Sequence, residues 1–489
     1  SLSPEIIDQP EAGEYTSITY DEMRGLVRRL AAGFRELGVE KDDRIGIMSN
    51  PRMEWAISDF GLLAAGGTVT TVYTESSPKQ IKYLLNDPGA TGVVVENEYL
   101  LDRIVKVQDE LSLEFVVVID ELEKYEDVDQ IHTLAEVYEL GDERFDEDEY
   151  WSWIEAQDMH DLASLIYTSG TTGKPKGVKL THHNFRANIN QLRKRTGPRP
   201  DKDDDVPAVS EGRTTISFLP LAHVFERTTG HFLMYACGAT VGYAESTDTV
   251  SEDIQKIKPQ GGSSVPRVYE RIFDEMREQA SGSDTKERIF EWAVGVARNY
   301  SQTDDPGLGL KLKRSIANQL VFKQVKEELG GNIDFFVSGG GSLSEDLADL
   351  FKGMGIPIFE GYGLTEAAPV VTVNLPESLE TGTLGPPLPD VDIRVDESQV
   401  ADDQFEDAEG EVGELLIKGP NVTEGYWEMP EKTEEAFTAD GWFKTGDIVE
   451  RVEDDYLIYH DRLKNLIVLD TGKNVAPEPI EDEFSTSSR

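Results

Sequence analysis

Cysteine is nearly absent from this chain of 489 residues, in which Cys237 stands alone. A single cysteine excludes an intrachain disulfide, and none of the cysteine-rich zinc patterns fits. The chain also lacks any uncharged apolar run of about 18 residues, so we expect no transmembrane helix. Residues 1–12 do not resemble a signal peptide. Together these absences predict a cytoplasmic protein.

Basic residues are scarce as well: 47 lysines and arginines stand against 94 aspartates and glutamates, a formal charge of −47. Nucleic acid is then a poor partner, and anionic membrane surfaces are disfavoured. The acids occur in many stretches, such as Asp142–Glu149, Asp201–Asp205 and Asp402–Glu411, which argues against a single acidic binding tail. We favour a protein adapted to high salt, because the Debye length in molar salt is only about 3 Å and self-repulsion is screened.

Apolar residues make up 38% of the chain, enough for a sizeable core, and the length predicts about two to four domains or subdomains. Strand and helix patterns alternate in the first part, which predicts a largely parallel sheet with helices on both faces. The expected elements are strands at Arg44–Ser49, Thr68–Tyr73, Ala90–Glu96 and Phe115–Asp120, and helices at Pro51–Ala65 (with Pro51 at its start), Pro78–Asn86 and Glu98–Leu111.

A second α/β series follows, with strands expected at Leu162–Thr168, Thr214–Leu219, Asp334–Ser338 and Ile356–Glu360, a mostly helical region at Val265–Leu329, and an exposed loop at Arg193–Arg213. Short strands between glycine and proline turns then predict a small β-barrel or sandwich. The overall expectation is an α/β fold with two layered subdomains over about 1–380, a β-barrel over about 381–460, and the start of a small α+β C-terminal domain at 461–489.

A glycine-rich loop, Tyr167–Val178 (YTSGTTGKPKGV), follows the strand Leu162–Thr168. It is not a Walker A loop, because only two residues separate Gly170 from Gly173. Its glycines, hydroxyls and lysines nevertheless suit a phosphate cradle. A flexible surface turn is the weaker interpretation, since so many phosphate-binding groups rarely share one short segment.

Four further motifs follow this loop in order: Phe218–Glu226 (FLPLAHVFE), Phe336–Leu343 (FVSGGGSL), Glu360–Pro369 (EGYGLTEAAP) and Gly441–Val449 (GWFKTGDIV). The set resembles the adenylate-forming (AMP-binding) superfamily over essentially the whole chain. The wording of FLPLAHVFE and the long helical region resemble its long-chain fatty acyl-CoA synthetases. The acidity together with this resemblance favours an origin in a halophilic archaeon.

The resemblance implies roles for particular residues. Thr168 and Glu366 resemble Mg²⁺ ligands, Lys174 a contact to the β- and γ-phosphates, and His223 the residue between the acyl pocket and the reacting carboxylate. Tyr362 resembles the aromatic residue packed on adenine, Thr365 a contact to the α-phosphate, Asp447 the acceptor for both ribose hydroxyls, Arg462 and Lys464 nucleotide contacts, and Gly472 part of a pantetheine channel. The remaining nucleotide-binding expectations are Ser169, Gly170, Thr171, Thr172, Gly173, Gly340, Gly341, Glu360, Gly361 and Gly363.

The implied reaction joins a fatty acid to ATP, giving acyl-AMP and pyrophosphate, and then to coenzyme A. Another acid on the same fold, or a non-catalytic adenylate-binding protein, stays open. The family's C-terminal domain carries a lysine used in the first half-reaction, but this chain ends 28 residues after the expected hinge at Asp461 (489 − 461). We therefore expect a fragment with impaired adenylation. The oligomeric state, a homodimer included, and peripheral membrane contact stay open.

Overall fold

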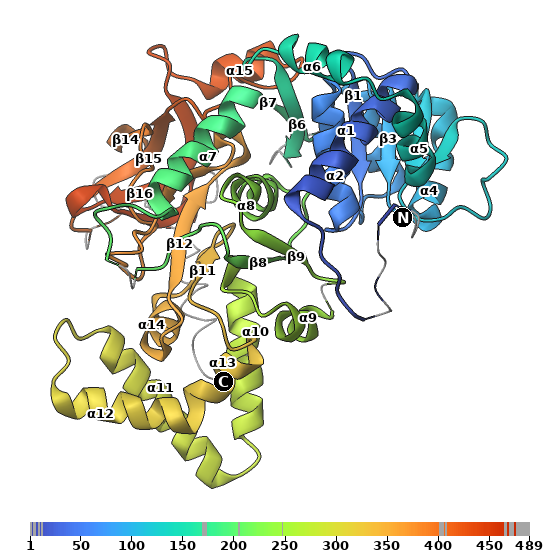
Figure 1. Ribbon diagram of the computed structural model, residues 1–489. Helices are drawn as coiled ribbons and strands as arrows, with labels where there is room; N and C mark the ends of the chain where they lie inside the picture. Colours follow the sequence, from blue (N-terminus) through green and yellow to red (C-terminus); the bar gives the residue numbers. More distant parts are fainter. Residues whose placement is uncertain are drawn as a thin grey trace.

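The protein is organised around three β-sheets in its main body (Figure 1). The computed structural model describes residues 2, 6–7, 10, 13–168, 174–203, 206–246, 248–400, 405, 408–463, 467–468 and 474–475. Within this part of the chain, none of the helices combines the length and the apolar character that a membrane span requires.

The first sheet has the strand order β5-β4-β3-β1-β2-β6-β7, and every neighbouring pair is parallel except the antiparallel pair β6 and β7. Its strands are β1 (Arg44–Met48), β2 (Thr68–Thr71), β3 (Gly92–Val95), β4 (Phe115–Val118), β5 (Ile131–Thr133), β6 (Leu162–Thr168) and β7 (Lys176–Thr181). The helices around it are α1 (Tyr20–Glu36), α2 (Met53–Ala64), α3 (Pro78–Asn86), α4 (Glu98–Val105), α5 (Leu134–Arg144) and α6 (Glu147–Glu155).

Helices cover both faces of this sheet, as the alternating pattern predicts. One apolar core contains residues of α1 and α2, and a separate one contains residues of α3 and α4. Strands such as Phe115–Val118 are buried on both faces, so they are continuously apolar. The four strands expected in the first part of the chain are each one to three residues shorter in the structure. Two helix boundaries were wrong: Pro51 precedes α2, whose N-cap is Arg52, and the helix expected to reach Leu111 ends at Val105 and is followed by a 3₁₀ turn.

The second sheet has the order β13-β12-β11-β10-β8-β9 and is parallel except for the antiparallel pair β12 and β13. Its strands are β8 (Thr214–Ser217), β9 (Thr240–Tyr243), β10 (Gly261–Ser264), β11 (Phe336–Ser338), β12 (Ile358–Gly363) and β13 (Val370–Val373). The associated helices are α7 (His182–Thr196), α8 (Leu233–Ala236), α9 (Val250–Ile257) and α14 (Glu345–Met354), with the π-helix η2 (Glu226–Phe232) and the 3₁₀ turn η4 (Thr365–Ala367).

A helical lobe projects from the second sheet, at the bottom of Figure 1. It consists of α10 (Pro266–Ala280), α11 (Asp284–Ser301), α12 (Leu308–Ala317), the π-helix η3 (Asn318–Phe322) and α13 (Lys323–Glu328). This confirms the mostly helical region expected at Val265–Leu329. Pro266 occupies the first turn of α10, where its missing N–H removes no intrahelical hydrogen bond.

The exposed loop expected at Arg193–Arg213 was wrong at its start, because α7 continues to Thr196. Arg195 in its last turn is only 7% exposed. Its guanidinium donates hydrogen bonds to the carbonyls of Val373, Pro386 and Pro387 at 2.6–3.3 Å. Its positive charge favoured a position exposed to solvent. In the structure, three backbone carbonyls distant in sequence accept its hydrogen bonds in the interior.

The third sheet is antiparallel, with the order β14-β15-β16-β17. Its strands are β14 (Asp392–Asp396), β15 (Glu411–Lys418), β16 (Phe443–Arg451) and β17 (Leu457–Arg462), and α15 (Pro430–Ala436) lies between β15 and β16 in the chain. The small β-region expected after residue 381 is therefore present, but as an open sheet: among the described strands, β14 and β17 do not pair. A short hairpin, β18 (Ile467–Val468) and β19 (Asn474–Val475), follows.

Candidate active site

A cavity of about 2840 Å³ lies where all three sheets meet. Thr168 at the end of β6, Gly339–Gly341 after β11, Gly363 at the end of β12, and Asp447 and Arg462 on the third sheet all line it. The first three positions follow the carboxyl ends of parallel strands, the edge at which open α/β sheets bind ligands. Residues from nearly 300 positions apart in the chain thus share one cavity.

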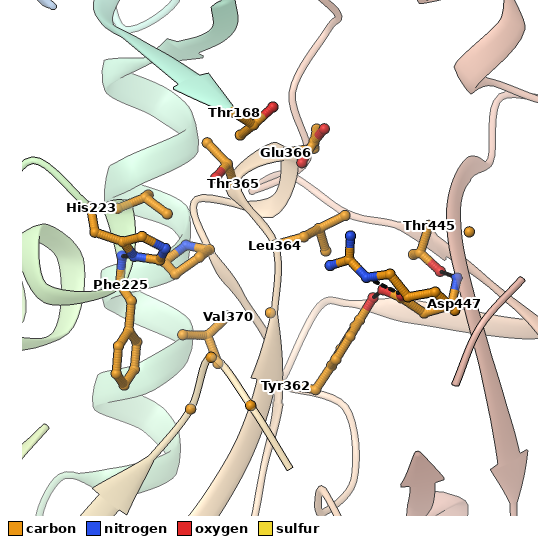
Figure 2. Close-up of a pocket in the computed structure, with 18 of the residues that line it drawn as sticks. Thr168, His223, Phe225, Tyr362, Leu364, Thr365, Glu366, Val370, Thr445 and Asp447 are labelled. Carbon is orange, nitrogen blue, oxygen red and sulfur yellow. Dashed lines mark hydrogen bonds and ion pairs between the residues drawn. The ribbon is translucent and has the colours of Figure 1, made fainter. Parts of the chain in front are cut away.

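Thr168, Thr365 and Glu366 lie near one another along this cavity (Figure 2). The Glu366 carboxylate accepts a hydrogen bond from the Tyr426 hydroxyl at 2.8 Å, which fixes its orientation. The Lys176 ammonium lies 4.0 Å from the centre of the Tyr426 ring. The Lys174 ammonium, in turn, lies 5.4 Å from the Tyr83 ring centre and also faces the cavity.

The donor set of Thr168 and Glu366 fits Mg²⁺ delivered with phosphates. In the described part of the chain, no group of three or more histidine, cysteine, aspartate or glutamate side chains could hold a metal ion by itself. Mg²⁺ commonly takes one or two protein oxygens and completes its shell with phosphate and water oxygens. One carboxylate and one hydroxyl meet that requirement.

The glycine-rich loop connects two antiparallel strands, since Thr168 of β6 pairs with Lys176 of β7. Next to it, the Tyr167 hydroxyl donates to Asp87 at 2.7 Å and the Tyr83 hydroxyl to the Pro175 carbonyl at 2.8 Å, so both ends of the loop are anchored. Seven of the expected site residues lie outside the described residues: Ser169, Gly170, Thr171, Thr172, Gly173, Lys464 and Gly472.

On the other side of the cavity, Tyr362 and Asp447 lie next to each other (Figure 2). Arg462 joins them in a connected group. The Tyr362 hydroxyl donates to Asp447 Oδ2 at 2.5 Å, and Arg462 Nε lies 3.3 Å from Asp447 Oδ1. Burial and the Asp447 charge both raise the pKa of Tyr362, so the phenol stays protonated. Burial lowers the pKa of Arg462, but Asp447, Tyr459 and Tyr362 together outweigh it and the net shift is upward. Asp447 is thus an acceptor whose carboxylate is held in place by Tyr362 and Arg462.

His223 and Phe225 face the cavity from the segment that follows β8 (Figure 2). The Phe225 backbone N–H donates to His223 Nδ1 at 3.1 Å, which places the imidazole proton on Nε2. Surrounding protein lowers the pKa of His223 through desolvation. The ring is therefore a neutral hydrogen-bond donor at pH 7.

Glu360 is 6% exposed, and burial raises its pKa to about 8. At pH 7 this side chain is therefore a neutral acid, not the carboxylate that its residue type suggests. Gly361 and Gly363 line the cavity beside it, yet backbone packing also requires them. A Cβ at Gly361 would lie 2.9 Å from the Thr372 carbonyl oxygen, and one at Gly363 would lie 2.5 Å from that of Pro369. Both glycines let β13 approach β12.

Gly340 and Gly341 also line the cavity. Gly340 has φ +78°, a conformation that side-chain-bearing residues rarely adopt. A Cβ at Gly341 would meet only Pro266 at ordinary contact distance. The two glycines therefore leave backbone exposed along the cavity wall, where a flat ligand can lie close.

A family model described as "AMP-binding enzyme" matches residues 3–427. That is most of the chain and includes nearly every motif above. The chain belongs to the AMP-binding enzyme family.

Among known AMP-binding enzymes and related structures, this chain is 35% identical over 480 residues to the long-chain-fatty-acid–CoA ligase FadD15 of Mycobacterium bovis, covering 96% of this chain and 74% of that protein. The adenylation domain of a Mycobacterium chelonae carboxylate reductase superposes with a TM-score of 0.74 at 24% identity, over 96% of this chain and 69% of that one. A long-chain-fatty-acid–CoA ligase of Archaeoglobus fulgidus gives 0.67 at 23% identity, over 93% and 80%. These solved structures confirm the fold.

In this AMP-binding enzyme, a buried charged cluster lies next to His223. The sequence did not predict this cluster. Arg227, which follows the FLPLAHVFE motif, is 0% exposed and binds both carboxylate oxygens of Asp59, at 3.0 and 2.5 Å. It also donates to Ser164 at 2.6 Å. These contacts attach the π-helix η2, and with it the His223 segment, to the first sheet. Asp59 is 168 positions away in the sequence, so no local signal could have paired them.

Tyr426 also escaped the sequence reasoning. It lies 60 residues beyond Glu366, in a stretch without any recognised motif, and its hydroxyl orients the Glu366 carboxylate. Burial and the charge of Glu366 raise its pKa, so it remains a donor. Only the packing of the β15–α15 connection against β7 brings it there.

Proposed function

We propose that this protein activates a long-chain fatty acid with ATP, forming acyl-AMP and pyrophosphate, and then transfers the acyl group to coenzyme A with release of AMP. The observation that carries the proposal is 35% identity to a long-chain-fatty-acid–CoA ligase along 96% of this chain. The cavity supports it, because phosphate-binding, ribose-binding and acyl-side candidates all line the same space.

Under this proposal, the nucleotide lies between the two sides of the cavity. Tyr362 packs on the adenine, and Asp447 accepts hydrogen bonds from the ribose hydroxyls while Arg462 holds its carboxylate in place. Glu360, Gly340, Gly341, Gly361 and Gly363 complete the adenine side. Ordered donors and acceptors of this kind need little rearrangement when the ligand binds.

The phosphate side must overcome repulsion between two anions, a fatty-acid carboxylate and a triphosphate. Lys174 and the glycine-rich loop would hold the β- and γ-phosphates, and Thr365 the α-phosphate. Thr168 and Glu366 would hold Mg²⁺, which when bound neutralises phosphate charge. Positioning and charge neutralisation of this type supply most of the acceleration in phosphoryl-type transfers.

His223 would orient the reacting carboxylate. Its Nε2–H donor faces the cavity from the side opposite Asp447, and its lowered pKa keeps the ring neutral. A neutral donor can hold the carboxylate without forming an ion pair that would quench its nucleophilicity. The acyl tail would then lie beyond His223 and Phe225.

The high acidity supports a second part of the proposal, namely a cytoplasmic enzyme of a halophilic archaeon. The charge of −47 predicts a free energy of unfolding that rises with KCl concentration, since salt screens self-repulsion. Denaturation at increasing KCl tests this. A free energy of unfolding that stays constant or falls would contradict it.

The catalytic proposal is tested with the gene product in its full length, MgATP, coenzyme A and a panel of acids: palmitate, octanoate, anthranilate and an amino acid. With palmitate, we expect release of pyrophosphate and formation of palmitoyl-CoA. Mass spectrometry detects the palmitoyl-CoA. Turnover of anthranilate or the amino acid alone would favour the alternative acid on the same fold. Nucleotide binding without pyrophosphate release for any acid would favour a non-catalytic adenylate-binding protein.

A further inference from the structure

The segment 306–326, which covers α12, η3 and the start of α13, has a charge opposite to that of the whole chain. It contains no aspartate or glutamate but five basic residues: Lys311, Lys313, Arg314, Lys323 and Lys326. Acids outnumber bases two to one over the whole sequence, so a run of 21 residues without any acid departs from the average. A longer acid-free run, 162–200, contains the glycine-rich loop and α7.

The same segment carries four of the large apolar side chains that are exposed in the described part of the chain. Leu308, Leu312, Ile316 and Leu320 are 87, 64, 44 and 55% exposed. Their spacing of four residues places them along one side of α12 and its continuation into η3. We call these four side chains the α12 stripe. The other side packs inward, since Ala317 and Phe322 are at most 1% exposed, so the stripe is additional to the core of the lobe.

The basic side chains divide into packed and free ones. Arg314 donates to the Gly353 carbonyl at 2.7 Å and stacks on Tyr300, so its charge is used inside the lobe. Lys311 and Lys313 are exposed and form no ion pair within the described residues. Lys323 is also exposed, and its contact to Glu327 at 3.6 Å is a weak surface pair. Free lysines therefore lie on the same short helix as the stripe.

The location of α12 suits a flat partner. It lies at the outer edge of the helical lobe, which projects from the body of the protein, and far from the first sheet (Figure 1). An amphipathic helix with leucines on one side and lysines beside them is typical of helices that lie in the interface of a bilayer. A projecting helix can reach such a surface without a clash from the rest of the chain.

We propose that the α12 stripe docks this protein on an anionic lipid bilayer. The leucines and Ile316 enter the boundary between headgroups and acyl chains, and Lys311, Lys313 and Lys323 contact lipid phosphates. The proposal corrects the expectation from net charge, which disfavoured anionic membranes. At a Debye length of about 8 Å in physiological salt, and of about 3 Å in molar salt, a lipid headgroup responds to the nearest lysines rather than to the sum over the chain.

The test is flotation of the purified 489-residue chain with two vesicle types, phosphatidylcholine alone and phosphatidylcholine mixed with phosphatidylglycerol. We expect binding to the anionic vesicles. Leu312→Ser/Ile316→Ser should lower the partition coefficient at least about tenfold, and Lys311→Gln/Lys313→Gln about fivefold per lysine. Added salt should weaken the wild type more than the lysine variant.

Matched controls come from other exposed positions. Tyr99 on α4 is 69% exposed and Lys106 at its end is exposed, so Tyr99→Ser and Lys106→Gln remove equivalent groups away from the stripe. Neither control should change binding, and all variants should keep the wild-type circular dichroism and melting temperature. Hydrogen exchange that slows in residues 308–320 on vesicle addition would locate the contact independently.

Three outcomes would overturn the proposal. The first is no flotation with anionic vesicles by a chain whose circular dichroism shows it folded. The second is equal flotation of the wild type and the Leu312→Ser/Ile316→Ser variant. The third is self-association without lipid, seen by light scattering and abolished by that same variant, which would assign the stripe to a second copy of the chain.

Discussion

Two aspartate–arginine pairs show how differently the same chemistry is used in this protein. Asp59 and Arg227 are both 0% exposed, and the guanidinium binds both carboxylate oxygens. Asp447 is nearly as buried, but its partner Arg462 is about half exposed and lies beside the cavity. The first pair joins two segments 168 residues apart, whereas the second faces the space where a ligand would lie.

The difference lies in what remains accessible to other partners. Burial raises the pKa of Asp59, but Arg227 and His231 together outweigh this effect and the net shift is downward. That carboxylate is enclosed by protein, and both of its oxygens accept hydrogen bonds from Arg227. Asp447 instead shares its carboxylate with Tyr362 and Arg462 on the cavity wall, where ligand hydroxyls can replace or join them. The buried pair is therefore enclosed between two segments of the fold, and the half-open pair remains accessible from the cavity.

The largest expected effect is on stability. Asp59→Asn leaves the Arg227 charge buried without its counter-ion, which typically costs about 3–5 kcal/mol. We expect the free energy of unfolding from urea denaturation to fall by that amount. A loss below about 1 kcal/mol would show that Arg227 finds another partner, and that the pair does not join the two segments.

The second largest effect is expected at Glu226, a buried carboxyl group that has no arginine partner among the described residues. Glu226 is 1% exposed, accepts one hydrogen bond from Ser217 at 2.6 Å, and has its pKa raised to about 8 by burial. Its neutral form favours the fold, so this contribution is complete below the unfolded-state pKa of 4.5 and is lost as pH rises towards 8. In the wild type, this effect should lower the free energy of unfolding by on the order of 3 kcal/mol across this pH range, and Glu226→Gln should abolish that decrease.

Denaturation at pH values from about 5 to about 8 measures this dependence. Glu360, whose pKa is also raised to about 8, adds a similar dependence, so Glu226→Gln should reduce the fall of stability with pH and Glu226→Gln/Glu360→Gln should reduce it further. An unchanged slope in both variants would mean that neither acid is neutral in the fold.

The cavity pair should behave in the opposite way to Asp59. We expect Asp447→Asn to change the free energy of unfolding little but to weaken MgATP binding by about 30-fold, the lower range for truncating a buried charged partner. Isothermal titration calorimetry checks the affinity. Loss of stability with unchanged affinity would make Asp447 a structural residue like Asp59.

The smallest effect is expected at the surface. Arg394 and Asp440 lie 3.2 Å apart with side chains 52 and 60% exposed. Arg394→Gln should therefore cost at most about 1 kcal/mol and leave MgATP affinity unchanged. Arg394→Gln is the control for Asp59→Asn and Asp447→Asn. A larger effect would mean that the exposure of an Asp–Arg pair does not determine its contribution to stability or binding.

The sequence predicted most of the fold, because the information for it is local. Pro78–Asn86, for example, has Ser77 as its N-cap and a capping box with Gln80, and the helix was predicted to the residue. The buried strands around Val94 and Val117 were clear from their continuous apolar runs. Boundaries failed where a tertiary contact decides them, as at Arg195, whose charge is satisfied by carbonyls from other segments.

The candidate site was predictable in part for the same reason. Motif residues such as Tyr362, Glu366 and Asp447 were found through the resemblance of their motifs to the adenylate-forming superfamily, and the structure brings them to one cavity. Their roles stay proposals. Asp59, Arg227 and Tyr426 were missed because each acts through a partner at least 60 residues away. The neutral state of Glu360 could not be predicted either, since burial sets it.

The central claim is that one cavity holds the nucleotide and the acyl group together. Calorimetric titration of palmitoyl-sulfamoyl-adenosine, a stable analogue of acyl-AMP, tests it most directly against AMP and palmitate alone. We predict that the linked compound binds at least about 100-fold more tightly than either part, because the second group binds at a high effective concentration. An affinity no higher than that of AMP would contradict the account.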